Sequence, residues 1–572
     1  MSSLLVWLES AGFTLAAFVA VIMPVVFFHE LGHLLVGLWR GVKPEKFSIG
    51  FGPKIFGFRV GETEVRLSLL PLGGYVKFAG DNPLEEPKPE DRGRGFIQAT
   101  PLSRGLIAAA GPFANFALAF VIFFALLLGP QRELAPAIGF VKPGSPAAAA
   151  GLQPRDQITS VDGAPVQSFT DLQEIIQANP DRQLTLGVVR AGQALSIQVT
   201  PEAVEDRSIL ETVKKGRLGF GAQQRLPVVA PTLAQGAAMR AGLQPFDRIA
   251  QVDGAQVASY EELLAHLASA LSRPPGDGLH ANVLLEGTRP REVAAPGGVL
   301  WVQDPLRLEL PAPALGRPAT PSEVETLLGL GSADLNLFAV LPGSAAEEAG
   351  LQRGDRLLSV DGKPVLWWSD EVETERLARG LLPMKMEVLR GGQTLAVTVV
   401  QHAKKRLDEA GVRVEVPELG ASPDYRIAYG EPQWITLHYG VLGALRHAGK
   451  EMLTSTRMIA LGLSGIASGK ISTEALGGPL MIADVARKAA ESGLVVLLGY
   501  IAMFSVNLGL MNLLPLPVLD GFHVLSAILE RIRRRPLSLR VIELANMFGL
   551  AALVTLMLFA FKNDLVRKFF QN

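Results

Sequence analysis

The sequence predicts a polytopic α-helical membrane protein with about four transmembrane helices, a membrane-associated β-hairpin region and three α+β domains. Three observations support this fold class. The hydrophobic fraction is 48% and the mean hydropathy is +0.28, which is high for a wholly soluble protein. Four apolar stretches are long enough to cross a bilayer, and one short motif recurs three times between the second and the third. With 572 residues, the chain is also too long for one domain.

The four apolar stretches define the predicted spans. They cover about residues 11–39, 106–128, 493–519 and 541–561, and each exceeds or approaches the length of about 20 residues that a membrane helix needs. The first lacks the basic start of a signal peptide, so we interpret it as a retained helix. The third ends in sequence rich in Asn, Gly and Pro, which at membrane depth is tolerated only against protein or a water-filled cavity.

Basic residues predict the orientation of these spans. The connection between the third and fourth contains the run Arg531-Ile532-Arg533-Arg534-Arg535, and the connection between the first and second carries eleven Lys and Arg residues. Lys and Arg concentrate in cytoplasmic loops. Both connections are therefore expected in the cytoplasm, and the segment between spans two and three on the opposite side.

Charge and cysteine content exclude several kinds of site. The formal net charge is −1, and no Lys/Arg-rich tract suggests nucleic acid as a partner. The chain contains no cysteine, which excludes disulfides and thiolate ligands. Any bound metal must therefore be held by histidine and carboxylate side chains.

The most informative motif lies inside the first span, where His29 and His33 flank Glu30. Residues four apart on a helix are separated by about 40° around its axis, so both imidazoles can bind one metal ion. Glu30 could then accept a proton from a water activated by that ion. Ionisable groups at this depth cost roughly 3 kcal/mol each on insertion scales, so they rarely occur without a function. The motif predicts zinc catalysis. A polar patch that packs helices would leave the pairing of Glu30 with two histidines unexplained.

A catalytic zinc usually takes three protein ligands, so one ligand is missing from the motif. Asp520, at the end of the third span, is the favoured candidate, although it could instead cap a helix at the interface. His523 competes for this role, but a histidine on the cytoplasmic surface is the favoured interpretation of this residue. Asn507 and Asn512 could bind a substrate backbone or an oxyanion, and hydrogen bonding between helices is the alternative for both.

Two further segments are expected beside the spans. From residue 47 to 78, apolar residues alternate and glycine recurs, which predicts strands and hairpins. From residue 434 to 466, basic residues interrupt an apolar pattern, which predicts an amphipathic helix along the membrane surface.

The repeated motif joins Ala-Gly-Leu-Gln to an Asp and then to Val-Asp-Gly, beginning at residues 150, 241 and 349. This order predicts a short helix ending at glycine, a turn, a strand and an Asp-Gly hairpin, and it resembles the PDZ domain. Peptide binding by the repeats and a spacer role without ligand both remain open. The best candidate for a carboxylate-binding loop is 216–220. The expected domains are 1–130 (membrane, with the metal motif and hairpin), 135–204, 216–312 and 322–416 (PDZ-like), 432–490 (amphipathic), and 491–572 (membrane, with the third ligand).

Several motifs occur in the order typical of one family: His29-Glu30-Leu31-Gly32-His33, Gly50-Phe51-Gly52-Pro53, Pro71-Leu72-Gly73-Gly74-Tyr75, Gly111-Pro112-Phe113-Ala114-Asn115, Gly478-Pro479 and Asn512 through Asp520-Gly521. Together they resemble the site-2 protease family of intramembrane zinc metalloproteases, in particular the bacterial regulator-of-sigma-E type with PDZ domains. The resemblance implies that His29, His33 and Asp520 bind zinc and that Glu30 is the general base. The sequence departs from the family in two respects. It has three repeats where this type commonly has two, and Phe522 stands where a second glycine is common after the aspartate.

The resemblance also implies a cellular role. The expected protein is a multi-pass zinc endopeptidase of the bacterial inner membrane, with its active site near the cytoplasmic side and its PDZ-like repeats outside, in contact with membrane lipid. Its expected substrates are single-pass transmembrane proteins, such as anti-sigma factors or signal-peptide remnants, that another protease has already cut. The repeats could exclude untrimmed substrates or bind extracytoplasmic peptides. The alternatives are a PDZ scaffold without proteolysis and a zinc carrier.

Overall fold

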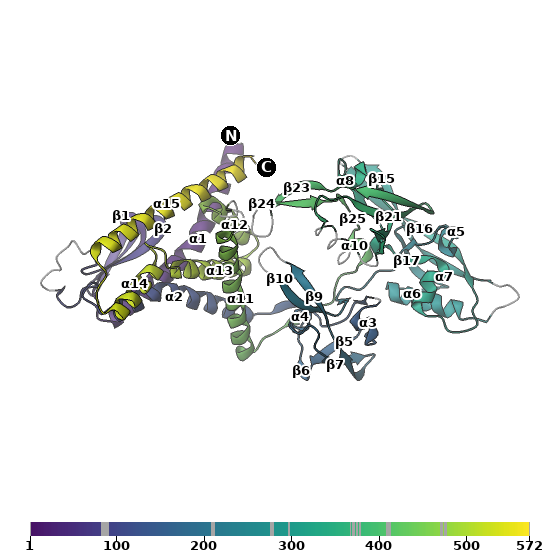
Figure 1. Cartoon of the computed structure of the whole chain (residues 1–572), viewed down its shortest axis with the longest axis horizontal. Helices are drawn as coiled ribbons and strands as arrows, with labels where there is room; N and C mark the ends of the chain where they lie inside the picture. The colour runs from purple at the N-terminus through teal and green to yellow at the C-terminus, as the bar shows by residue number, and fades with distance from the viewer. Residues whose placement is uncertain are drawn as a thin grey trace. The chain divides into compact units, whose positions relative to one another are not determined.

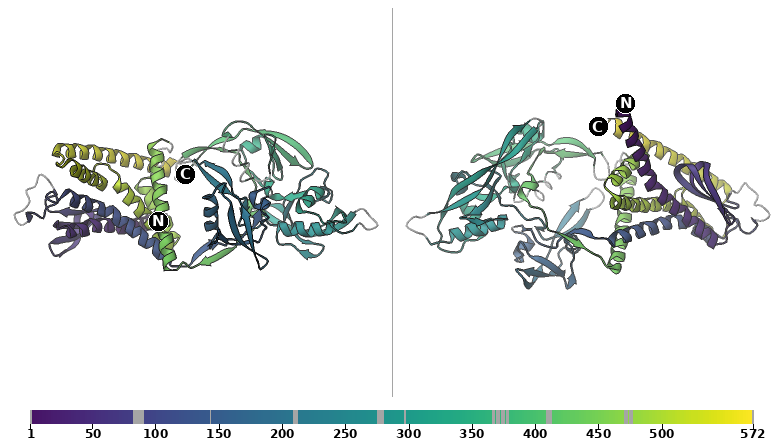
Figure 2. Two further views of the ribbon diagram at one scale, coloured as in Figure 1. Left: turned by 60° about the horizontal axis from the view of Figure 1, so that its bottom comes forward. Right: turned by 180° about the vertical axis from the view of Figure 1, so that it is seen from behind.

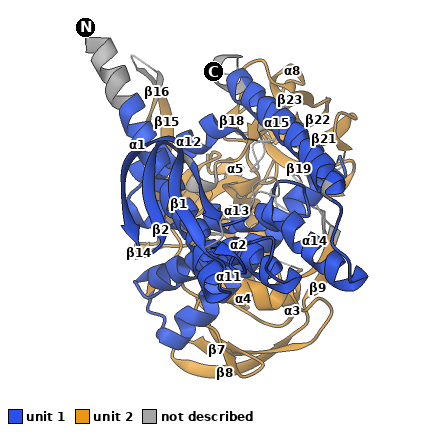
Figure 3. Cartoon of the chain, turned by 90° about the vertical axis from the view of Figure 1, so that its left-hand side faces the viewer, with its two compact units in different colours: residues 1–131, 409–412, 437–572 blue, residues 132–408, 413–436 orange. Residues whose placement is uncertain are grey.

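A computed structural model describes residues 2–570 except 82–90, 143, 208–211, 275–279, 296–297, 366–367, 369–371, 373–375, 377–378, 408–412, 470–472 and 474–476. The chain divides into two compact units, which Figure 3 shows in blue and orange. The first unit comprises Met1–Gln131, Glu409–Val412 and Leu437–Asn572, and the second comprises Arg132–Asp408 and Arg413–Thr436. The first holds the long apolar helices, and the second holds the repeats.

Helix α2 (Pro101–Leu127) packs against most of the other helices of the first unit. Small residues let its neighbours approach closely, as in other membrane helix pairs. A Cβ on Gly32 would lie 2.4 Å from the Ala110 carbonyl oxygen, and one on Gly509 would lie 3.1 Å from the Pro112 carbonyl oxygen. Four helices contact α2: α1 (Ser2–Trp39), α11 (Val441–Ala467), α13 (Leu494–Leu513) and α14 (Asp520–Arg533).

Within the described residues, four helical segments are long and apolar enough to span a membrane: Ala11–Trp39, Pro101–Leu127, Leu494–Leu513 and Arg540–Val566. Their number agrees with the prediction.

The third span is shorter than expected. Helix α13 ends at Leu513, and the chain turns through residues 514–519 before α14 begins at Asp520. Two prolines in this turn cannot donate a backbone hydrogen bond, and Val518 adopts a φ of +80°. Asp520 is therefore the first residue of a separate helix and not the end of the span.

Helix α12 (Pro479–Glu491) packs against both α1 and the C-terminal helix α15 (Leu539–Phe570). The buried Asp564 carboxylate of α15 accepts hydrogen bonds from the N–H of Gly478, at 3.0 Å, and from two N–H groups in the first turn of α12, at 2.9 and 3.2 Å. It thus caps the positive end of α12. A Cβ on Gly478 would lie 2.5 Å from this carboxylate, which explains the glycine before Pro479.

The amphipathic segment differs from the prediction at its start. Trp434–Leu437 form strand β26, and helix α11 begins only at Val441. The expectation of helix from residue 434 onward is therefore wrong for these residues. In α11, Met452 and Ile459 pack against Ala119 of α2 and Ala502 of α13. The helix thus contacts two candidate membrane spans along its apolar side.

Strands β1 (Pro44–Val60) and β2 (Thr63–Phe78) confirm the predicted β structure and lie beside α1, in purple in Figures 1 and 2. Both strands bend. Ile49 pairs with both Leu67 and Gly74, so the first part of β1 lies between two parts of β2. Residues 74–77 consequently pair on one side only and form an edge of the sheet.

The second unit contains three modules in which the same elements follow one another. The first and third modules have four-stranded sheets in the orders β6-β5-β7-β8 and β20-β19-β21-β22. In the middle module the order is β16-β15-β13-β12-β17, and β14 pairs with β13. Each module has its own buried apolar core.

The elements of the second unit have the following bounds. The chain enters through β3 (Gln131–Leu134). The first module contains β4 (Phe140–Val141), α3 (Pro146–Ala149), β5 (Gln157–Val161), β6 (Ala164–Pro165), α4 (Phe169–Gln177), β7 (Leu184–Arg190), β8 (Gln193–Val199), β9 (Glu202–Arg207), β10 (Thr212–Arg217) and β11 (Phe220–Gly221). The middle module contains β12 (Val228–Pro231), α5 (Ala237–Arg240), β13 (Asp247–Val252), β14 (Ala255–Gln256), α6 (Tyr260–Leu271), β15 (His280–Ala295), β16 (Gly298–Pro313), α7 (Pro321–Leu328) and β17 (Leu330–Ser332). The third contains β18 (Ala339–Val340), α8 (Ala345–Glu348), β19 (Arg356–Val360), β20 (Lys363–Pro364), β21 (Met384–Arg390), β22 (Gln393–Val399), β23 (His402–Leu407), β24 (Arg413–Glu418), β25 (Ala421–Ser422) and α10 (Tyr425–Ala428).

A buried ion pair explains the repeated motif. In the first module the Asp156 carboxylate, which is 0% exposed, accepts two 2.7 Å hydrogen bonds from Arg190, and Arg190 also donates to the Gly151 carbonyl. This carboxylate raises the pKa of the Arg190 guanidinium. Asp247 with Arg289 and Asp355 with Arg390 repeat the arrangement. Because a buried charge must be paired, the motif keeps the turn of each module in place.

The module cores cross two expected boundaries. Leu218 belongs to the first core, and β11 pairs with β4, so the loop at 216–220 closes the first module and does not open the second. Val324 and Leu328 of α7 belong to the core of the middle module, although residues from 322 onward were expected in the third. The closing strands and α7 lie outside the repeated motif, which explains why the repeat did not reveal them.

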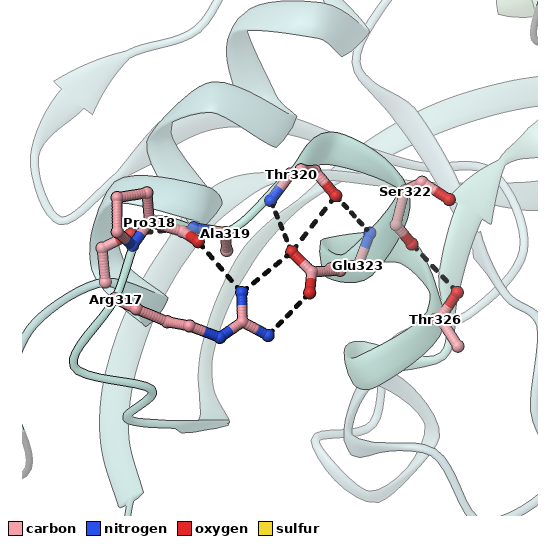
Figure 4. A network of polar contacts seen from close by, with 8 residues as sticks. Arg317, Pro318, Ala319, Thr320, Ser322, Glu323 and Thr326 are labelled. Carbon is pink, nitrogen blue, oxygen red and sulfur yellow. Dashed lines mark hydrogen bonds and ion pairs between the residues drawn. The ribbon is translucent and has the colours of Figure 1, made fainter.

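A polar network holds the N-terminus of α7 (Figure 4). The Thr320 hydroxyl accepts from the Glu323 N–H at 3.3 Å, and the Glu323 carboxylate accepts from the Thr320 N–H at 2.9 Å, which forms a capping box. Arg317 pairs with the same carboxylate at 2.7 Å. The hydrogen bonds from Arg317 and Thr320 lower the pKa of Glu323 to about 2.

Replacing Thr320 by alanine should lower the opening free energy of α7 by about 1 kcal/mol, because one N–H loses its acceptor. Amide hydrogen exchange at Val324 and Leu328 in the whole protein would measure it. Since the folded-state pKa of Glu323 is depressed, its contribution is complete above the ordinary value of 4.5 and disappears as the pH falls toward 2. Ser322→Ala leaves these hydrogen bonds intact and is the control. Equal exchange in both variants would show that the cap does not stabilise α7.

Candidate metal centre

His29 and His33 of α1 meet Asp520 at the start of α14. Asp520 Oδ2 lies 3.1 Å from His29 Nε2 and 3.4 Å from His33 Nε2, and the two Nε2 atoms are 3.3 Å apart. The two histidines are buried, with 7% and 9% of their surface exposed. Among the described side chains, these three form the group whose ligand atoms lie close enough to hold one metal ion, all within 4.8 Å of one another.

A backbone contact orients His33. Its Nδ1 lies 2.8 Å from the Ile107 carbonyl oxygen, which can only accept a hydrogen bond. Nδ1 therefore carries the proton, and the Nε2 lone pair is left facing His29 and Asp520. A hydrogen bond of this kind, made by the ring nitrogen that does not bind the metal, fixes the tautomer of metal-binding histidines.

Asn115 of α2 provides the same support for His29. Asn115 Nδ2 lies 3.2 Å from His29 Nδ1, while Asn115 Oδ1 is buried and has no hydrogen-bond partner among the described residues. Turning the amide over exchanges two atoms of similar shape and gives the orphaned oxygen the His29 Nδ1–H as its partner. His29 then presents the Nε2 lone pair on the same side as His33. The residues present therefore fit a zinc ion.

Gly111 makes room for both rings. A Cβ at this position of α2 would lie 2.3 Å from His33 Nε2 and 2.9 Å from His29 Cε1. Such distances are far below van der Waals contact, so α2 can approach the metal group only where a side chain is absent.

Glu30 lies beside the metal group and against the sheet. Its side chain is buried, with 8% of the residue exposed, and the Val76 backbone is within hydrogen-bonding reach of the carboxylate. A Cβ on Gly74 would lie 2.9 Å from Glu30 Cγ. The predicted base is therefore adjacent to the edge formed by residues 74–77.

The remaining predicted residues differ in their placement. Asn512 reaches the site, since its Nδ2 lies 3.3 Å from His29 Nε2. Asn507, on the same helix, makes no hydrogen bond to the metal group among the described residues, because five positions of separation turn it to another side of α13. His523 is exposed and lies outside the group formed by His29, His33 and Asp520.

The sequence predicts no role for the Ile107 carbonyl, and none for Gly111 or Asn115 beyond their place in a motif typical of the family. The carbonyl is part of the backbone and has no sequence signal. Asn115 did have one, because a primary amide within an otherwise apolar span is expected to hydrogen bond inside the bundle. Its partner could not be read from the sequence, since α1 and α2 are connected by a long segment.

Asn115→Leu should weaken zinc binding by about 10–100-fold, as expected when the hydrogen bond that orients a ligand is lost. Asn115→Asp, which retains an oxygen acceptor for His29 Nδ1–H, should bind zinc much more tightly than the leucine variant. Competition with a chromogenic chelator measures the affinity without reference to catalysis. If the leucine variant bound zinc as tightly as the unaltered protein, Asn115 would not orient His29.

Comparisons with known proteins identify the family. The family model of peptidase family M50 matches residues 17–556. A protein named as a zinc metalloprotease in Neisseria meningitidis is 30% identical over 561 residues, which cover 97% of this chain and 99% of the relative. Protease RseP of Yersinia pestis and regulator of sigma-E protease RseP of Escherichia coli are each 29% identical, and the matches cover 97% of this chain and 98% of each relative.

The match covers most of the chain, and the chain contains a buried group of two histidines and an aspartate inside a bundle of apolar helices. The protein therefore belongs to peptidase family M50, as the site-2 protease resemblance predicted, and is a metalloendopeptidase.

Proposed function

We propose that the protein is an intramembrane zinc endopeptidase that cuts single-pass membrane proteins within or near their transmembrane segments. The observation that carries this proposal is the convergence of His29, His33 and Asp520 beside Glu30, buried among helices of membrane-spanning length. A structural metal would not require the adjacent buried carboxylate.

The chain's own residues can perform the proton transfers of peptide hydrolysis. Held by His29, His33 and Asp520, zinc would supply the Lewis acidity that polarises the peptide carbonyl and activates water. Glu30 accepts the proton of the attacking water at its carboxylate and then passes it to the leaving nitrogen. The Asn512 amide, whose Nδ2 lies 3.3 Å from His29 Nε2, would donate a hydrogen bond to the carbonyl oxygen as charge develops there.

The edge at residues 74–77 suggests how the substrate is held. A helical substrate hides its carbonyls in hydrogen bonds, so it must unwind before it can be cut. An extended segment could add to this edge through main-chain hydrogen bonds and would then lie next to Glu30. Large apolar side chains exposed along the sheet favour its contact with lipid: Phe51, Ile55, Phe56, Phe58, Val60, Leu69 and Leu70.

We place the protein in the inner membrane, with the three modules outside and the active site near the cytoplasmic side. The name of the Escherichia coli relative, regulator of sigma-E protease RseP, suggests an anti-sigma factor as one substrate class. Every residue proposed for catalysis lies in the first unit, so the modules are not needed for the chemistry itself. We interpret the modules as PDZ-like and assign them a filtering role, in which they would exclude substrates whose outer domain is intact. This arrangement makes the protein the second of two proteases to act.

Metal removal tests the proposed activity. The purified protein, supplied with a tagged single-pass substrate that lacks its outer domain, should cleave it until a chelator removes the metal, and added zinc should restore cleavage. Fragment size on a gel reports the reaction. Full cleavage by protein whose metal content is negligible would refute a zinc endopeptidase.

Single cysteines test the orientation, because the chain contains none of its own. An impermeant thiol reagent applied to spheroplasts should label Gln193→Cys in the first module and leave Ser538→Cys unlabelled until the membrane is broken. Both positions are exposed in the structure. The opposite labelling pattern would place the modules in the cytoplasm.

A further inference from the structure

An arginine-lined cavity lies between the beginning of α2 and the end of α14, both in the first unit. Its volume is about 340 Å³. One acidic and four basic side chains contribute to its wall. The lining residues are Pro101, Arg104, Glu530, Arg531, Arg534, Arg535 and Pro536.

The acidic residue does not neutralise this cavity. The Glu530 carboxylate is buried and already accepts hydrogen bonds from Arg104 and, at 3.2 Å, from the Leu537 N–H. In the part of the chain that the structure describes, the guanidinium groups of Arg531, Arg534 and Arg535 form no ion pair or hydrogen bond with protein groups. Arg104 Nε is buried and has no hydrogen-bond partner within the described residues. The cavity therefore carries an excess of positive charge and unsatisfied donors.

The need for basic residues in a cytoplasmic loop does not explain this geometry. Arg533 and Arg540 belong to the same basic stretch and would serve that purpose, yet neither lines the cavity. A topological signal requires charge in the loop but no common concave wall. The convergence of residues from two helices points to a ligand.

We propose that this cavity binds a phosphate group, carried by an anionic phospholipid. Guanidinium groups match phosphate oxygens with paired N–H donors, and an anion there would also face the positive end of α2. Leu102 and Ile532, which follow the lining residues Pro101 and Arg531 in the sequence, are 59% and 72% exposed. They offer apolar contacts to acyl chains that a free phosphate ion would not use. Basic pockets beside membrane helices bind anionic head groups in the same way.

Lipid retention tests the site. The full-length protein would be released from nanodiscs of phosphatidylcholine and phosphatidylglycerol, and bound phosphatidylglycerol counted by native mass spectrometry. Losing two charged donors in the Arg534→Gln/Arg535→Gln variant should weaken retention by about tenfold or more. Arg533→Gln, which like Arg531→Gln removes one charge from the same stretch but lies outside the cavity, should retain the lipid. Arg531→Gln tests the wall from α14 if the double variant does not fold.

Inorganic phosphate distinguishes the source of the ligand. If detergent-purified protein bound inorganic phosphate through Arg534 and Arg535 while phosphatidylglycerol retention was unaffected, the phosphate site would hold and its ligand would be soluble. If Arg534→Gln/Arg535→Gln and Arg531→Gln bound both probes as well as Arg533→Gln does, the proposal would be wrong.

Discussion

Replacing Glu30 by glutamine is expected to reduce peptide cleavage by about 10²–10⁴-fold, the usual contribution of a general base. Glutamine has nearly the same shape but cannot accept a proton from water. The residue lies beside the metal ligands without belonging to the group they form. Zinc content should therefore remain close to that of the unaltered protein. Metal analysis and cleavage of a trimmed substrate, measured on one preparation, give both quantities.

The same variant separates protease activity from the two alternative functions. A scaffold or a zinc carrier would tolerate Glu30→Gln, because neither needs a proton acceptor at this position. Glu451→Gln on α11 makes the same chemical change at an exposed site and should cleave normally. Undiminished cleavage in Glu30→Gln would remove Glu30 from the mechanism.

Replacing Gly111 by alanine should disrupt the metal site and lower zinc affinity on the order of a hundredfold. Helix propensity alone would make this substitution stabilising, since alanine is favoured over glycine within a helix by about 1 kcal/mol. The added Cβ, however, would lie 2.3 Å from His33 Nε2. Because the Ile107 carbonyl holds the other ring nitrogen, His33 can yield only by moving its ligand atom or breaking that bond.

Gly499→Ala is the matched control on α13, where a Cβ would meet nothing within 4 Å. It should leave zinc binding unchanged. Chelator competition reports the affinity in both variants, and thermal unfolding without zinc reports whether the bundle itself has changed. If Gly111→Ala kept full zinc affinity, the rings would not approach α2 as closely as the structure indicates.

Local periodicity carried much of the fold prediction. Length and apolar composition identified the spans, and the spacing of His29 and His33 placed both imidazoles on one helical face. Alternation identified the strands between residues 47 and 78. Each of these signals lies within one element, so a single sequence contains it in full.

The features that sequence analysis missed depend on pairs of distant segments. Asp520 begins its own helix after a turn, and that helix, α14, packs against α2, which is far away in the sequence. The contact of Asn115 with His29 joins residues 86 positions apart. The boundary of the first module depends on the pairing of β11 with β4, for which the repeated motif contains no information.

The assembly of the metal group from both ends of the chain has a consequence for biosynthesis. His29 and Asn512 lie within hydrogen-bonding distance of each other although they are 483 positions apart in the sequence, and Asp520 follows later still. A ribosome makes the histidines and all three modules before it makes the third ligand. The nascent chain therefore enters the membrane with two of its three proposed metal ligands, and on this proposal it gains the ability to cut peptide bonds only once its last helices have been inserted.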